Sequence, residues 1–278
     1  MICLDQKSYI QKIIKKYGME DCKPTSTPYD PSNKLSRDMM PKNEEEEKEM
    51  KNVPYREAVG GLLYISQGTR PDVAYAVSTV SRYMQNLGRN HWTAVKRILR
   101  YLRGTLDYRL QFGKDQAKGH ENITGYCDAD WANESDTRRS VTGNIFLFQG
   151  GPITWQSKLQ STVALSTTEA EYMALSAGCQ EAMWLRALVR DLQPLLVSSP
   201  TELYNDNKGA IDLVKNGGYR SRTKHIDIRH HFIREMNENS EIVVNYLPTT
   251  EMIADALTKG LYASKFKDCI TRMGLIDC

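Results

Sequence analysis

The sequence predicts an α/β fold with a mixed β-sheet, preceded by a small all-α module. Two features indicate it. Up to about residue 106 apolar residues recur at helical spacing, whereas from Tyr108 they alternate as they do in strands. After Tyr108 several strands come first, and strands that alternate with helices follow. This order is typical of a mixed sheet with helices packed against it.

The first part of the chain, residues 1–106, is expected to be a helical module. Its helical segments lie at 5–17, 55–67, 71–85 and 91–103. Pro71 suits the first position of its helix, and Asp72 suits the positive end of the helix dipole. Residues 23–54 are rich in Pro, Ser, Thr and Glu. We therefore expect a flexible loop over 23–54.

The second part of the chain carries the expected strands. The first group covers 108–112, 121–128, 141–148 and 152–157. The third and fourth of these are joined through Gly150-Gly151, a hairpin signal. A long helix over 167–192, a strand over 202–205, helices over 207–216 and 227–238, a strand over 242–247 and a helical region from 250 complete the prediction.

Composition limits the protein class only loosely. Apolar residues make up 40% of 278, which allows a normal core, and the formal net charge of +3 does not by itself indicate a nucleic-acid binder. The six cysteines include no C-x-x-C pair, which favours a reducing compartment. No apolar run reaches bilayer length, so no membrane partner is expected. The expected location is cytoplasmic, with the nucleus as the alternative.

Four acids lie where a structural role explains them least well. Asp128 ends an apolar strand, Glu171 lies early in the long helix, Asp206 ends another strand, and Asp255 lies in the last helical region. Acids at strand ends and in early helix turns can meet at one edge of a sheet. Carboxylates held together repel each other unless cations neutralise them, and hard oxygen ligands suit Mg²⁺. Spacing alone leaves turn and helix-end roles open for each acid.

Glu169 has a simpler role than Glu171. Ser166 followed by Glu169 matches a capping box, in which each side chain binds the backbone N–H of the other residue. Glu169 is then used by the helix end. Glu171 lies nearly on the opposite side of the helix and is free to bind a metal ion.

Six ordered motifs resemble the ribonuclease H domain of copia-type LTR retrotransposon Pol polyproteins. They are Tyr-Cys-Asp-Ala-Asp-Trp-Ala (126–132), Asp-Thr-Arg-Arg-Ser-Val-Thr-Gly (136–143), Leu-Ser-Thr-Thr-Glu-Ala-Glu-Tyr (165–172), Tyr-Asn-Asp-Asn-Lys-Gly-Ala-Ile (204–211), Arg-Thr-Lys-His-Ile-Asp-Ile-Arg (222–229) and Ala-Asp-Ala-Leu-Thr-Lys (254–259). Residues 55–64 and 69–75 resemble the region that follows the polymerase palm in these polyproteins. The resemblance covers nearly the whole chain.

The resemblance implies a ribonuclease H-like fold over 107–262, after a reverse-transcriptase remnant over 1–106 and before a helical tail over 263–278. It also implies an endonuclease that hydrolyses the RNA strand of RNA–DNA hybrids during reverse transcription by a two-metal mechanism. The ions would be two Mg²⁺, with Mn²⁺ as the alternative. The missing polymerase palm would be a further partner, and no small-molecule cofactor is implied.

Asp128, Glu171, Asp206 and Asp255 match the family's metal-binding and catalytic acids. There is one departure from the wider pattern. Cellular ribonucleases H usually carry a histidine shortly before the last aspartate, and Leu247-Pro248-Thr249-Thr250-Glu251 stands there instead. Proton transfer or product release is therefore expected to be handled differently, with His225 as one candidate substitute.

Hybrid binding is expected to use the sugar–phosphate backbone rather than the bases, because such a nuclease must distinguish ribose from deoxyribose. For each candidate, a solvated surface charge is the plain alternative. The candidates are Arg138, Arg139, Lys158, Gln160, Arg222, Lys224 and His225.

Two other functions compete with this prediction. An inactive or domesticated retroelement fragment would bind nucleic acid or a partner without cutting it, and the intact set of acids argues against it. A polymerase is the other. Tyr126-Cys127-Asp128-Ala129-Asp130 is not the Tyr-x-Asp-Asp of a reverse transcriptase, and no such motif occurs elsewhere in the sequence. We therefore expect no DNA synthesis.

Overall fold

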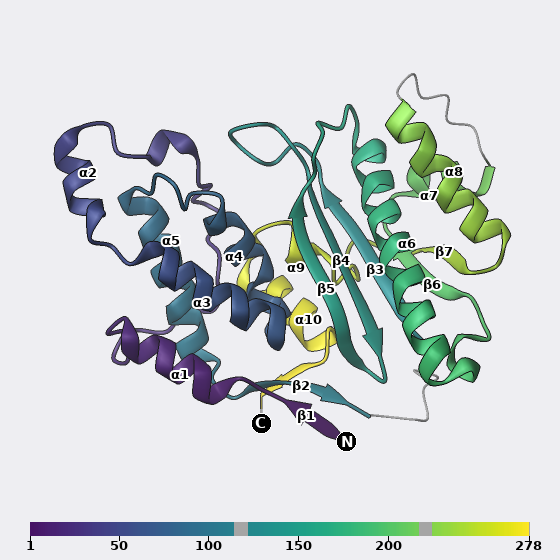
Figure 1. Cartoon of the computed structure of the whole chain (residues 1–278), viewed down its shortest axis with the longest axis horizontal. Helices are drawn as coiled ribbons and strands as arrows, with labels where there is room; N and C mark the ends of the chain where they lie inside the picture. The colour runs from purple at the N-terminus through teal and green to yellow at the C-terminus, as the bar shows by residue number, and fades with distance from the viewer. Residues whose placement is uncertain (114–121, 217–223, 278) are drawn as a thin grey trace.

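The computed structural model describes residues 1–113, 122–216 and 224–277, without the side chains of 224–230. Helices and a mixed sheet confirm the predicted α/β class. The helices of the first hundred residues lie on one side of the larger sheet and α6, α7 and α8 on the other, with α9 and α10 beside the helical module (Figure 1). In the described part of the chain, no helix combines the length and apolarity needed to cross a bilayer.

The larger sheet has five strands in the described part of the chain, in the order β5-β4-β3-β6-β7. Strands β3, β4 and β5 are antiparallel, whereas β6 runs parallel to β3 and β7 parallel to β6. The sheet therefore begins as a meander and continues as crossovers, which places the ends of β3 and β6 at one edge. The strands are β3 (Thr124–Asp130), β4 (Val141–Phe148), β5 (Gly151–Leu159), β6 (Thr201–Asn205) and β7 (Ile242–Tyr246).

The β4–β5 hairpin turns one residue earlier than its glycines suggest. Phe148 pairs with Gly151, so Gln149 and Gly150 form the two-residue loop. Both have positive φ, 54° and 80°, as the tight hairpin turn that matches strand twist requires. Gly150 adopts this conformation without strain, and Gly151 is the first residue of β5.

The long helix confirms its prediction and covers one face of the sheet. Helix α6 (Thr167–Leu192) packs on β3 and β4, and Leu175 and Cys179 enter a core with Cys127 and Leu203. The 3-10 turn Pro194–Val197 follows it. Helices α7 (Lys208–Asn216) and α8 (Lys224–Glu238) pack against each other and against β7 on the same side.

The helical module shares a core with the larger sheet. Leu62 and Ile98 of the module belong to the same buried cluster as Ile145 of β4 and Leu257 of α9. The two predicted parts are therefore joined by buried apolar contacts. The module contains α1 (Lys7–Lys16), α3 (Tyr55–Gly68), the 3-10 turn Pro71–Val73, α4 (Ala74–Ser81) and α5 (Arg89–Gly104).

The expected loop over 23–54 contains regular structure and buried contacts. It includes the 3-10 turn Arg37–Met39 and helix α2 (Glu44–Lys51), which Asn43 caps through Glu46 N–H. Leu35 is buried, and Arg100 of α5 donates a hydrogen bond to the Lys23 carbonyl at 2.6 Å. The composition of this segment did not indicate these contacts, because the residues that make them are few and widely spaced.

A second, smaller sheet joins both ends of the described chain to its middle. In it β2 (Tyr108–Phe112) lies between β1 (Ile2–Leu4) and β8 (Leu275–Asp277). The strand expected at 108–112 is thus present but does not open the larger sheet. Local alternation of residues cannot show which partner a strand will pair with. Helices α9 (Asp255–Thr258) and α10 (Ala263–Arg272) precede β8.

A buried ion pair holds the helical module together at the start of α4. The side chains of Arg70 and Asp72 are 0% exposed, and Arg70 Nη2 lies 2.7 Å from Asp72 Oδ2. Tyr101 Oη donates to Asp72 at 2.6 Å, and Arg70 donates to the Thr105 carbonyl at 2.9 Å. Hydrogen bonds thus satisfy both buried charges, the condition under which such a pair is tolerated.

We predict that Asp72→Ala will lower the free energy of unfolding by about 3–5 kcal/mol, because it leaves the Arg70 charge buried without its partner. Urea unfolding at pH 7 measures this. Asp107→Ala, which breaks the half-exposed Lys7–Asp107 pair, is the matched control and should change stability little. Equal losses in both variants would contradict the role assigned to the buried pair.

Candidate metal centre

Three of the four predicted acids meet where the inner strands β3 and β6 of the sheet end. Asp128 lies near the end of β3, Glu171 in the early turns of α6 and Asp206 directly after β6. Parallel pairing of Tyr126 with Tyr204 sets Asp128 and Asp206 at the same level. One carboxylate oxygen from each acid lies within 4.8 Å of the others. Asp128 and Glu171 are buried, and Asp206 is half-buried.

Close packing of α6 on β3 brings Glu171 close to Asp128. A Cβ atom at Gly178 would lie 2.2 Å from Cys127 Sγ, so only glycine permits this approach. The Ser166 hydroxyl accepts from Glu169 N–H at 3.1 Å, but the Glu169 carboxylate accepts from Leu165 N–H rather than from Ser166 N–H. The predicted cap is therefore present in a variant form. The Glu169 carboxylate thus caps the start of the helix, whereas the Glu171 carboxylate contacts Asn205.

Asn205 orients the Glu171 carboxylate. Its Nδ2 donates to Glu171 Oε2 at 2.9 Å and to the Cys127 carbonyl at 3.0 Å. Asn205 is fully buried at the end of β6, so it ties together β6, β3 and α6 beneath the acids. The sequence analysis did not single out Asn205, although it lies within the Tyr-Asn-Asp-Asn motif.

Asp255 reaches the cluster through a lysine. Lys259 Nζ lies 2.7 Å from Asp255 Oδ1 and 3.8 Å from Asp128 Oδ2. The Thr258 hydroxyl donates to Asp128 Oδ2. The group of three acids within 4.8 Å does not include Asp255. The sequence analysis did not single out Thr258 or Lys259 either, although both lie in the Leu-Thr-Lys end of the last motif, beside Asp255.

The segment that stands where cellular ribonucleases H have a histidine contacts the site through a hydroxyl. Thr249 Oγ1 donates to Asp206 Oδ2 at 2.6 Å. Lys265 Nζ donates to the Thr249 and Thr250 carbonyls at 3.0 and 2.6 Å, and so fixes this turn. The side chain of His225, the candidate substitute, lies outside the described residues.

Burial dominates the electrostatics of the acids. It raises the pKa of Asp128 to about 7, against the opposing pull of Lys259 and with a further rise from Asp255. Burial, and then the Asp128 charge, raises the pKa of Glu171. Burial lowers the pKa of Lys259, but Asp128 and Asp255 more than offset this and raise it overall. These acids therefore favour either a proton or a cation close by.

The donor set fits a hard divalent ion. Asp128, Glu171 and Asp206 offer carboxylate oxygens, the ligands that Mg²⁺ prefers, and no sulfur or imidazole of the described residues belongs to the group. Asp255 and Lys259 lie beside this group, and the Lys259 ammonium balances part of the negative charge. The catalytic and metal-binding roles of the four acids remain predictions.

The predicted nucleic-acid-binding residues fall into separate places. Arg138 and Arg139 lie in the turn after β3, where Arg138 is exposed with φ of 58°. Lys158 and Gln160 line one cavity beside α6. Arg222 lies outside the described residues, as do the side chains of Lys224 and His225.

Comparison with known proteins gives sequence relatives over almost the whole chain. The retrovirus-related Pol polyprotein from transposon TNT 1-94 of Nicotiana tabacum is 46% identical over 98% of this chain and 20% of its own length. That from transposon RE2 of Arabidopsis thaliana is 36% identical over 98% of this chain and 18% of its own length. The chain thus spans about a fifth of these relatives. No protein-family model matches it.

Among solved structures, LC11-RNase H1 in complex with an RNA/DNA hybrid is 16% identical over 49% of this chain and 94% of its own, with a TM-score of 0.37. The sequence relatives and the mixed α/β architecture agree with the ribonuclease H-like fold that the motifs implied. The chain therefore belongs to the copia-type retrovirus-related Pol polyproteins of LTR retrotransposons.

Proposed function

We propose that this chain is a Mg²⁺-dependent endonuclease that hydrolyses the RNA strand of RNA–DNA hybrids. The convergence of Asp128, Glu171 and Asp206 within 4.8 Å carries the proposal, because few structural roles account for three acids gathered at one sheet edge. Membership of the Pol polyproteins supports the choice of substrate. Mg²⁺ ions held by these three carboxylates would supply an activated water and would stabilise the leaving oxygen of a phosphodiester.

The chain's own residues have distinct tasks in this proposal. Asp128, Glu171 and Asp206 hold the ions, and Asn205 keeps the Glu171 carboxylate oriented. Asp255 lies buried beside these acids, where Lys259 neutralises it and offers an ammonium group toward Asp128. Thr249 restrains Asp206 through its hydroxyl, where cellular enzymes would place a histidine.

The proposal is tested with a labelled RNA–DNA hybrid and Mg²⁺, with duplex RNA, duplex DNA and single-stranded RNA as comparison substrates. We expect cleavage of the RNA in the hybrid alone, abolished by chelator and by Asp128→Asn. Asp212→Asn, on the exposed side of α7, is the matched control and should cut normally. Tight hybrid binding without cleavage by the unaltered chain would favour the inactive, domesticated fragment instead.

We further predict that the metal-free chain loses stability as pH rises from about 4 to about 7. The pKa of Asp128 is raised to about 7 in the folded chain, above its ordinary value of 3.8. Between these values the folded state therefore binds more protons than the unfolded state, and stability falls with increasing pH. Melting temperatures in chelator at several pH values measure this effect.

Two controls accompany the pH series. Asp128→Asn cannot ionise and should flatten the slope, whereas added Mg²⁺ should restore stability mainly at the higher pH, where it displaces no proton. A slope that is identical in Asp128→Asn would assign the effect to other groups.

A further inference from the structure

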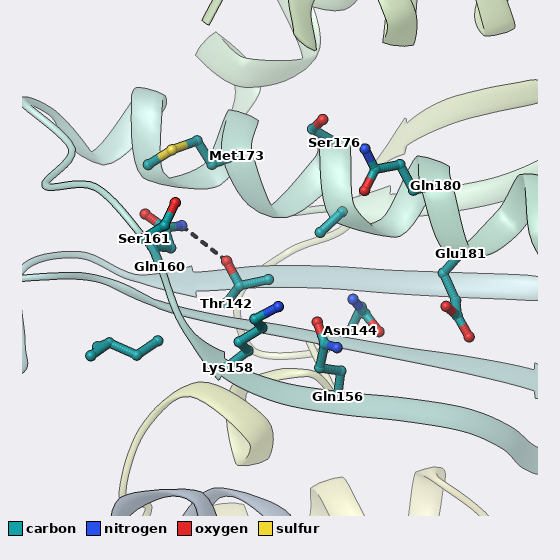
Figure 2. Close-up of a pocket in the computed structure, with 12 residues that line it drawn as sticks. Thr142, Asn144, Gln156, Lys158, Gln160, Ser161, Met173, Ser176, Gln180 and Glu181 are labelled. Carbon is teal, nitrogen blue, oxygen red and sulfur yellow. Dashed lines mark hydrogen bonds between the residues drawn. The ribbon is translucent and has the colours of Figure 1, made fainter. Parts of the chain in front are cut away.

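A polar cavity of about 340 Å³ lies between α6 and the neighbouring strands β4 and β5. Asn144, Gln156 and Lys158 line it from the strands, and Gln180 and Glu181 line it from α6 (Figure 2). None of the three clustered acids lines this cavity. One end of the cavity is close to them, because its lining residue Thr142 pairs with Ala129, the residue after Asp128.

Two buried polar atoms of the cavity lining lack a hydrogen-bond partner among the described residues. They are Gln160 Oε1 and Ser176 Oγ, on side chains of residues 7% and 1% exposed. The Gln160 amide cannot be turned over to solve this. Its Nε2 donates to the Ala170 carbonyl at 3.0 Å, and a carbonyl only accepts. A buried acceptor without a donor calls for an occupant that supplies one.

The lining chemistry selects the kind of occupant. The amides of Asn144, Gln156 and Gln180 each offer a donor beside an acceptor, the pattern that matches the edge of a nucleobase. Lys158 can meet one phosphate, whereas Glu181 disfavours a group with many negative charges. A paired base has its Watson–Crick edge in use and stays within its stack, so an occupant that enters this cavity is an unpaired nucleotide.

We propose that this cavity binds one unpaired nucleotide of a strand that continues beyond the hybrid held at the carboxylate cluster. This rests on the proposed function and adds a second contact to it. A hybrid with a single-stranded extension is then the preferred substrate over a blunt one, and Lys158 and Gln160 act at the extension rather than on the duplex.

The test measures binding rather than cutting. The full chain carrying Asp128→Asn is titrated, with Ca²⁺ present, against a blunt hybrid and against the same hybrid with a short 3′ or 5′ single-stranded extension on either strand. We expect one extension to tighten binding about three- to tenfold, the effect of one or two added hydrogen bonds. Gln156→Ala with Gln180→Ala should remove this gain and leave blunt-hybrid affinity unchanged.

The control and the outcomes separate this inference from the proposed function. Lys267→Ala, an exposed lysine of α10, should keep the full gain. Ser176→Leu, which narrows the cavity, should remove the gain, with melting temperature confirming that it folds. Blunt binding with no gain from any extension, or a gain that survives the cavity variants, overturns the nucleotide site alone. Failure to bind any hybrid overturns the proposed function as well.

Discussion

The free-energy cost of gathering negative charge in a place with little water governs the architecture around the end of β3. Asp128, Glu171 and Asp255 are all buried, and each is held by a partner that cannot easily move away. Asn205 is locked between two strands and a helix, and Thr258 and Lys259 end a short helix pressed onto β4. These rigid neighbours hold the carboxylates in place, and the Lys259 ammonium offsets part of their mutual repulsion.

The helical module takes part in this arrangement from a distance. Helix α4 packs against α9, and α9 in turn packs against β3, β4 and β5. A Cβ at Gly143 of β4 would lie 2.7 Å from Thr258 Cγ2, so α9 rests directly on the strand backbone. The module thus supports the helix that carries Asp255, which explains why the two predicted parts share one core.

Local signals predicted what local forces determine. The period of apolar residues predicted α6 with its bounds, and acids at two strand ends and in an early helix turn predicted the three that converge. Pairing between distant segments, as in β1-β2-β8, leaves no local trace and was not predicted. Asn205 and Lys259 matter because of what tertiary packing sets beside them, which composition and spacing do not reveal. Sparse anchors such as Leu35 likewise made an ordered segment resemble a loop.

The small sheet has a topological consequence. Because β1 and β8 flank β2, the first and last described residues leave the molecule on the same side (Figure 1). In a longer polyprotein, the segments before and after this region would both leave from this small sheet, on the two sides of β2 and at its opposite ends. Circular permutation that joins these ends by a linker long enough to cross β2 from one end to the other should therefore preserve the fold.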